Sequence, residues 1–202
     1  MANLSDLYRL DNFNDTFALG HYARVLDALD RRTGHSVAFK VMRTEHLSAD
    51  GDMRWEYRAF GNEADILMKL ADSPYVVGMT DCGYLSDPGE VPSGGELESF
   101  QRDVLGFIQA MPTFARRGWR PYLGLQNLPR THNLLYLMKP NQGGTRWRLP
   151  SEEGLALALQ FAEVLRLAHH KNIVYLDHKL EHVYWDGGQL RIIDFNSSRQ
   201  ID

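Results

Sequence analysis

Residues 36–42 alternate strictly between two sets of side chains, which is the pattern of a β-strand with two different faces. Val37, Phe39 and Val41 share one face, because successive residues of a strand point to opposite sides. The other face carries Lys40 in the middle of the strand. The chain therefore has to build a sheet with one apolar face and with a lysine on the opposite face.

The segments on either side of this strand predict a sheet that packs with a helix. Residues 24–29 form a second β-like run, and the turn residues 30–34 join the two strands. A helical pattern then covers residues 53–70, where Phe60, Glu63 and Leu67 recur at i, i+3 and i+7. Further strands are expected at residues 17–19 and 75–85.

The C-terminal third predicts one long helix and one hairpin. Ser151 can cap a helix over residues 151–169, and Glu152 and Glu153 favour its positive end. Its expected apolar stripe consists of Leu155, Leu159, Ala162, Leu165 and Ala168. Residues 183–193 read as a β-hairpin around a turn at 186–188. Together these elements predict an α+β fold.

Residues 86–133 interrupt the regular pattern. Turn-forming residues gather at 87–89 and 92–95, and residues 96–111 are expected to form a short helix. Pro112, Pro121 and Pro129 punctuate the remainder. We therefore interpret residues 86–133 as an insertion rather than a second domain.

The composition excludes several classes of protein. The chain has 202 residues, of which 44% are hydrophobic and 24% are charged, so it is not a disordered tail. Its one cysteine, Cys82, excludes an intrachain disulfide framework and is expected in the core. A net charge of −4 argues against a nucleic-acid partner. The apolar runs reach only five residues, so no membrane span and no signal peptide are expected.

Residues 177–182 concentrate ionisable side chains between an apolar strand and an apolar hairpin. Alone, such a loop is more often a solvated surface. Asp194 follows the second strand of the hairpin, which would bring it back beside Asp177. Two carboxylates at the mouth of one hairpin can hold a divalent cation and accept a proton.

Lys40 and Glu63 could form a pair. Taken separately, Lys40 reads as an exposed strand lysine and Glu63 as a charge at a helix edge. A buried Glu63 would need a cation, and Lys40 is the nearest candidate in the strand before it. Such a pair could hold an anionic ligand, and the small residues Ala18, Gly20 and Ala23 would let backbone N–H groups approach phosphates.

In this order, these motifs resemble the eukaryotic-like (Hanks-type) Ser/Thr protein kinase superfamily. Residues 18–25 resemble the glycine-rich loop, and Val37-Ala38-Phe39-Lys40 resembles the Val-Ala-Ile-Lys strand. Glu63 resembles the helix glutamate that pairs with that lysine. Residues 135–140 resemble the strand and hinge that meet adenine, with Met138 as gatekeeper. Residues 173–182 resemble the catalytic loop, and Asp194-Phe195-Asn196 resembles Asp-Phe-Gly.

The resemblance implies a two-lobed, protein-kinase-like fold with an antiparallel-sheet N-lobe over residues 1–138. The hinge and a truncated, mostly helical C-lobe would cover residues 139–202. It also implies transfer of the ATP γ-phosphoryl group to Ser/Thr hydroxyls of a protein substrate, with Mg²⁺ or Mn²⁺. Asp177 and Lys179 would be catalytic, and Asp194 and His182 would bind metal. The implied ATP-binding residues are Ala18, Gly20, Val25, Ala38, Lys40, Glu63, Met138, Lys139 and Pro140.

The sequence also departs from the pattern of the resemblance. His182 stands where these kinases have a metal-binding asparagine, which puts the second magnesium site in doubt and favours manganese. Tyr175 and Leu176 replace His-Arg, and the chain ends eight residues after Asp194. These departures keep open a pseudokinase that binds nucleotide or acts as a scaffold, and a small-molecule phosphotransferase. We expect a cytoplasmic protein, or a secreted effector acting in a host cytoplasm.

Overall fold

The computed structural model describes residues 1–13, 22–47, 50, 52–138 and 149–201. The chain divides into two compact units. The first unit consists of residues 1–68 and 78–127, and the second consists of residues 69–77 and 128–202. The α+β class is confirmed. The boundary expected after residue 138 does not coincide with this division, because residues 69–77 and 128–138 group with the C-terminal residues.

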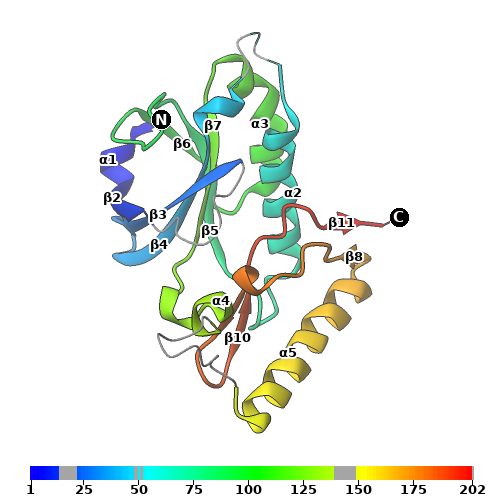
Figure 1. Ribbon diagram of the computed structural model, residues 1–202. Coiled ribbons are helices and arrows are strands. Elements are labelled where there is room, and N and C mark those ends of the chain that lie inside the picture. Colours follow the sequence, from blue (N-terminus) through cyan, green and yellow to red (C-terminus); the bar gives the residue numbers. More distant parts are fainter. Residues whose placement is uncertain (14–21, 48–49, 51, 139–148, 202) are drawn as a thin grey trace. The chain divides into compact units, whose positions relative to one another are not determined.

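A seven-stranded antiparallel sheet forms the first unit among the described residues, in the order β1-β6-β5-β7-β4-β3-β2 (Figure 1). The strands are β1 (Ala2–Asn3), β2 (Tyr8–Phe13), β3 (Ala23–Asp30), β4 (His35–Met42), β5 (Met79–Leu85), β6 (Glu96–Ser99) and β7 (Arg120–Gln126). The helices of this part of the chain are α1 (Leu4–Leu7), η1 (Thr44–His46), α2 (Trp55–Lys69) and α3 (Val104–Arg116).

The two faces of β4 have the different roles that its alternation predicts. Val37, Phe39 and Val41 are buried in a core cluster with Leu4 and Tyr122. On the opposite face, the antiparallel register pairs Lys40 with Val25 of β3 and with Leu123 of β7. Because cross-strand partners lie on the same side of a sheet, these residues share one face with Ala38. Strand β4 therefore carries Lys40 on the face opposite to the main apolar cluster.

The second unit combines one long helix with short strands (Figure 1). Its elements are η2 (Arg130–His132), α4 (Leu134–Leu137), α5 (Ser151–His170), β8 (Ile173–Val174), η3 (Leu180–His182), β9 (Val183–Trp185), β10 (Leu190–Ile192) and β11 (Arg199–Gln200). Strands β9 and β10 form the predicted hairpin, in which Trp185 pairs with Leu190. No helix in the described ranges is both long and apolar enough to cross a membrane.

The interpretation of residues 86–133 as one insertion is wrong at its C-terminal end. Residues 120–126 are β7, which lies in the sheet between β4 and β5. Pro121 suggested a loop, yet it lies near the start of this strand, opposite Tyr84. The expected short helix at 96–111 is instead the strand β6 followed by α3, and Pro112 lies inside α3. The inserted segment is therefore residues 86–119.

The apolar run at residues 134–138 predicts a buried strand or a helix piece, and residues 134–137 form the short helix α4, at whose start Asn133 accepts a hydrogen bond from the backbone N–H of Leu135. A second local expectation differs from the structure. In α5, the expected apolar stripe is largely exposed: Leu155 and Leu159 are each 63% accessible, whereas Val164 and Ala168 are buried. The helical repeat predicted helix α5 correctly, but it did not show which side of the helix packs against the rest of the protein.

Candidate active site

Lys40 and Glu63 form a buried ion pair in the first unit. Lys40 Nζ lies 2.9 Å from Glu63 Oε1 and 2.7 Å from Oε2. Glu63 is fully buried and Lys40 is 6% exposed. The alternation of β4 and the helical repeat of α2 each place one partner, and the packing of α2 against the sheet brings the two together. The carboxylate thus has the cation that its burial requires.

Tyr22 lies beside this pair, and the sequence analysis did not single it out. Its phenol donates to Glu63 Oε2 over 3.5 Å, and Lys40 Nζ lies 5.3 Å from the centre of its ring. The ring also packs edge-on against Phe60. The tyrosine therefore helps to remove the ion pair from water, next to a face that carries the half-buried Val25 and Ala38.

A second polar cluster lies in the second unit, at the open end of the hairpin of β9 and β10. His182 Nε2 lies 3.1 Å from Asp194 Oδ2, and His182 Nδ1 lies 3.1 Å from the backbone carbonyl of Asp177. Lys179 Nζ lies 3.0 Å from Asp177 Oδ2. The hairpin thus brings Asp194 back beside the 177–182 loop, as its position in the sequence predicts. The backbone N–H of Ile193 also donates to the carbonyl of His182.

The cluster has the geometry of a cation site. One ligand atom from each of Asp177, His182 and Asp194 lies within 4.8 Å of the others. If Nδ1 of His182 donates its proton to the Asp177 carbonyl, Nε2 presents a lone pair toward Asp194. An imidazole nitrogen and two carboxylates suit Mn²⁺ or another transition metal better than Mg²⁺. The donor set present therefore fits a divalent metal.

The neighbouring residues fix the positions of these groups. Asn133 donates through Nδ2 to the carbonyl of Glu181, at 2.7 Å, and anchors the loop that holds His182. Tyr175 packs its ring against the buried Phe195 and donates to the carbonyl of Ile193. Asp194 has a φ of 62°, a left-handed conformation that aspartate tolerates better than most residues. Asn133 had no signal in the sequence beyond its position before an apolar run.

The described part of the segment that was expected to meet adenine, residues 135–138, is helix and turn. Met138 follows α4 and is 37% exposed, and it belongs to the second unit. The expected gatekeeper strand is therefore absent at residues 134–138. Ala18, Gly20, Lys139 and Pro140 lie outside the described residues. The strand that does lead from the first unit into the second is β7, and the chain crosses at residues 127–128.

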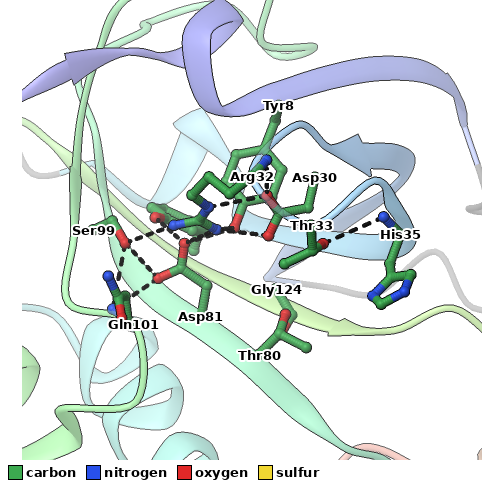
Figure 2. Close-up of polar contacts among 11 residues, drawn as sticks. Tyr8, Asp30, Arg32, Thr33, His35, Thr80, Asp81, Ser99, Gln101 and Gly124 are labelled. Atoms are coloured by element: carbon green, nitrogen blue, oxygen red, sulfur yellow. Dashed lines mark hydrogen bonds and ion pairs between the residues drawn. The ribbon is translucent and has the colours of Figure 1, made fainter.

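Asp81 is the centre of a further buried network that the sequence analysis missed (Figure 2). Its Oδ2 accepts hydrogen bonds from Tyr8, Arg32 and Tyr122, at 2.6, 2.8 and 3.1 Å. Its Oδ1 accepts from the hydroxyl of Ser99 and from the backbone N–H of residue 101. With five donors, the carboxylate is well satisfied, and the network joins β2, β5, β7 and the inserted segment. We assign it a structural role.

Comparison with known proteins gives one distant relative and no family. No protein-family model matches the chain. The chain is 24% identical over 196 residues to atypical protein kinase C of Drosophila melanogaster. The match covers 96% of this chain but 25% of the kinase, so the chain spans about a quarter of the length of that relative. This similarity suggests a distant, kinase-like relationship, and the antiparallel sheet of the first unit is compatible with the N-lobe of a kinase.

Proposed function

We propose that this protein is an ATP-dependent protein kinase that transfers the γ-phosphoryl group to serine or threonine hydroxyls of a protein substrate. The observation that carries the proposal is the cluster of Asp177, His182 and Asp194, in which the hairpin returns Asp194 to the loop that carries the other two residues. The Lys40–Glu63 pair and the distant similarity to a protein kinase support it.

Each residue has a chemical role in the proposed reaction. Lys40, held by Glu63, binds the α- and β-phosphates of ATP. The substrate hydroxyl oxygen attacks the γ-phosphorus, the bond from that phosphorus to the bridging oxygen of ADP breaks, and the hydroxyl proton passes to Asp177. Lys179, 3.0 Å from Asp177, stabilises negative charge on the transferring phosphoryl group.

A divalent cation would be held by Asp194 and His182. It would supply positive charge that offsets the charge of the phosphates. The role of His182 is to offer Nε2 in a fixed direction, since its Nδ1 is engaged by the carbonyl of Asp177. We propose Mn²⁺ as the preferred ion because one of the two ligands is a nitrogen.

We place the adenine contact directly after β7 instead of at Met138. In the protein kinases that the sequence resembles, the hinge follows a strand of the first lobe. Here β7 is the strand from which the chain enters the second unit, at Asn127 and Leu128. Leu125 of β7 pairs with Ala38, so it shares a face with Ala38 and Val25. These three apolar residues are the proposed contacts of the adenine ring.

ATP is abundant in cytoplasm, and we propose that the protein acts there, in its own cell or in a host.

The test is transfer of label from γ-labelled ATP to the protein itself and to a generic protein substrate, with Mg²⁺ or Mn²⁺. Asp177→Asn should lower the rate by about 10²–10⁴ if this residue is the base. Asp72→Asn is the matched control, because the Asp72 side chain is 89% exposed in the same unit. Equal rates in the parent and in Asp177→Asn would contradict the assignment. Label on a sugar or an antibiotic with none on protein would instead indicate a small-molecule phosphotransferase.

A pseudokinase is the second candidate, and one observation favours it. Lys40 is 6% exposed, with its Nζ 5.3 Å from the centre of the Tyr22 ring, so its ammonium offers little accessible surface to a phosphate. A protein that keeps this arrangement would act as a scaffold or bind nucleotide without turnover. Binding of ATP, measured by calorimetry, with no transfer of label under either metal would support this reading.

A further inference from the structure

Helix α3 of the inserted segment packs against α2 (Figure 1). A Cβ atom built on Gly61 of α2 would lie 3.1 Å from Met111 Cε and 3.4 Å from Ile108 Cγ1, so the two helices approach closely at this glycine. Gly61 precedes Glu63 by two positions, which is about 200° around an α-helix. The two residues therefore point to nearly opposite sides, and α2 lies between α3 and the lysine strand β4.

The sheet holds α3 firmly in place. Tyr84 of β5 donates its hydroxyl to the carbonyl of Phe107, at 2.6 Å. The same ring stacks on Phe107 and Phe114, with centroid separations of 4.9 and 4.4 Å. Tyr84 and Phe107 are fully buried. The helix is thus fixed to a strand of the sheet through one hydrogen bond and two aromatic contacts.

A hydrogen bond also ties α2 to the end of the inserted segment. The hydroxyl of Tyr57 on α2 donates to the backbone carbonyl of Trp119, at 2.8 Å. The next residue, Arg120, is fully buried and donates to the carbonyls of Met42 and Gly89, at 3.1 and 2.8 Å. Met42 ends the strand that carries Lys40. The inserted segment is therefore bonded directly to α2, and it is linked to the end of β4 through Arg120, the first residue of β7.

We propose that α3 is a built-in brace that keeps α2 seated, so that Glu63 stays paired with Lys40 without a second protein or a modification. Tyr57, Ile108 and Met111 are then positioning residues. The inference rests on the proposed function, because that function gives the ion pair its catalytic purpose. The packing of α3 on α2 does not depend on it.

The test is to remove the brace contacts and to measure hydrogen exchange of the α2 amides relative to the β4 amides. Ile108→Ala/Met111→Ala deletes the side chains that meet α2 at Gly61, and Tyr57→Phe deletes the hydrogen bond to Trp119. We expect α2 to exchange about tenfold faster relative to β4 in the double variant, and less so in Tyr57→Phe. Leu105→Ala, on the same helix but at a 67% exposed position, is the control and should leave the ratio unchanged.

The reference to β4 separates a local effect from a global one, because a general loss of stability accelerates exchange in both elements. If the parent protein transfers phosphate, a positioning role predicts that the brace variants have a raised KM for ATP together with a lowered kcat. An unchanged exchange ratio in both brace variants would overturn the inference, whether or not the parent transfers phosphate. A raised ratio in a protein that transfers no phosphate would uphold the brace and reject the proposed function.

Discussion

The ammonium of Lys40 lies 2.7 Å from the carboxylate of Glu63, and both side chains are almost wholly removed from water. The two residues come from a strand and a helix that are separated by 23 positions along the chain. Breaking such a buried pair leaves a charge without its partner, which costs much more than replacing both groups by apolar ones. Replacing one partner and replacing both should therefore affect stability differently, whereas either change should abolish the role of the pair in ATP use.

Lys40→Ala should therefore lower both stability and ATP use. We expect a loss of about 3–5 kcal/mol in the free energy of unfolding, because Glu63 is left buried and unpaired. The double variant Lys40→Met/Glu63→Leu should recover most of that stability while still failing to use ATP. Urea unfolding and label transfer, measured on the same samples, check both parts. A double variant as unstable as Lys40→Ala would show that packing, and not the lost partner, determines the cost.

His182→Asn should change the metal preference of the protein. Replacing the imidazole by an amide oxygen removes the nitrogen ligand, so Mn²⁺ affinity should fall roughly tenfold while Mg²⁺ affinity is kept or rises. Titration of each ion followed by calorimetry checks this without any activity assay. His169→Asn, at the exposed end of α5, is the control. The assignment of His182 as a ligand fails if both variants bind Mn²⁺ as the parent does.

Asp81→Asn should be among the most destabilising single substitutions in the first unit. The amide can no longer accept from Tyr8, Arg32 and Tyr122 together, and the Arg32 guanidinium loses one of its two buried carboxylate partners, the other being Asp30. We expect a loss of about 3 kcal/mol in thermal or denaturant unfolding. Asp11→Asn, which breaks an exposed ion pair with Arg9 on β2, should cost less than about 1 kcal/mol. Comparable losses in the two variants would contradict the structural role of the network.

Acid should loosen the inserted segment through Asp87. Burial disfavours its charged form, but hydrogen bonds from the backbone N–H groups of Ser93, Gly89 and Gly94 outweigh this and lower its pKa below the ordinary 3.8. A lowered folded-state pKa contributes stability that is present above the unfolded value of 3.8 and is lost as the pH falls through the lower folded-state value. The gap in unfolding free energy between the parent and Asp87→Asn should therefore shrink on acidification from pH 6 to pH 3. A difference that stays constant with pH would mean that the charge of the Asp87 carboxylate contributes nothing to the free energy of unfolding.

Local patterns were enough to predict most elements and the members of both polar clusters. The alternation of residues 36–42 placed Lys40 on β4, the helical repeat placed Glu63 on α2, and the hairpin after residue 182 returned Asp194 to Asp177. Each of these features depends on residues close together in the sequence, and their side-chain pattern reflects one strand, one helix or one tight turn. The amino-acid sequence by itself thus determined which chemical groups the two clusters contain.

The tertiary structure alone decided which segments became central and which sides were buried. Residues 120–126 look like a proline-interrupted loop, yet they pair with β4 and β5 on either side. Asp81 gives no local sign that four side-chain donors from other strands and turns converge on it. The apolar stripe of α5 is regular but largely exposed. Strand pairing and burial depend on partners remote in the sequence, so no window of neighbouring residues contains the information that fixes them.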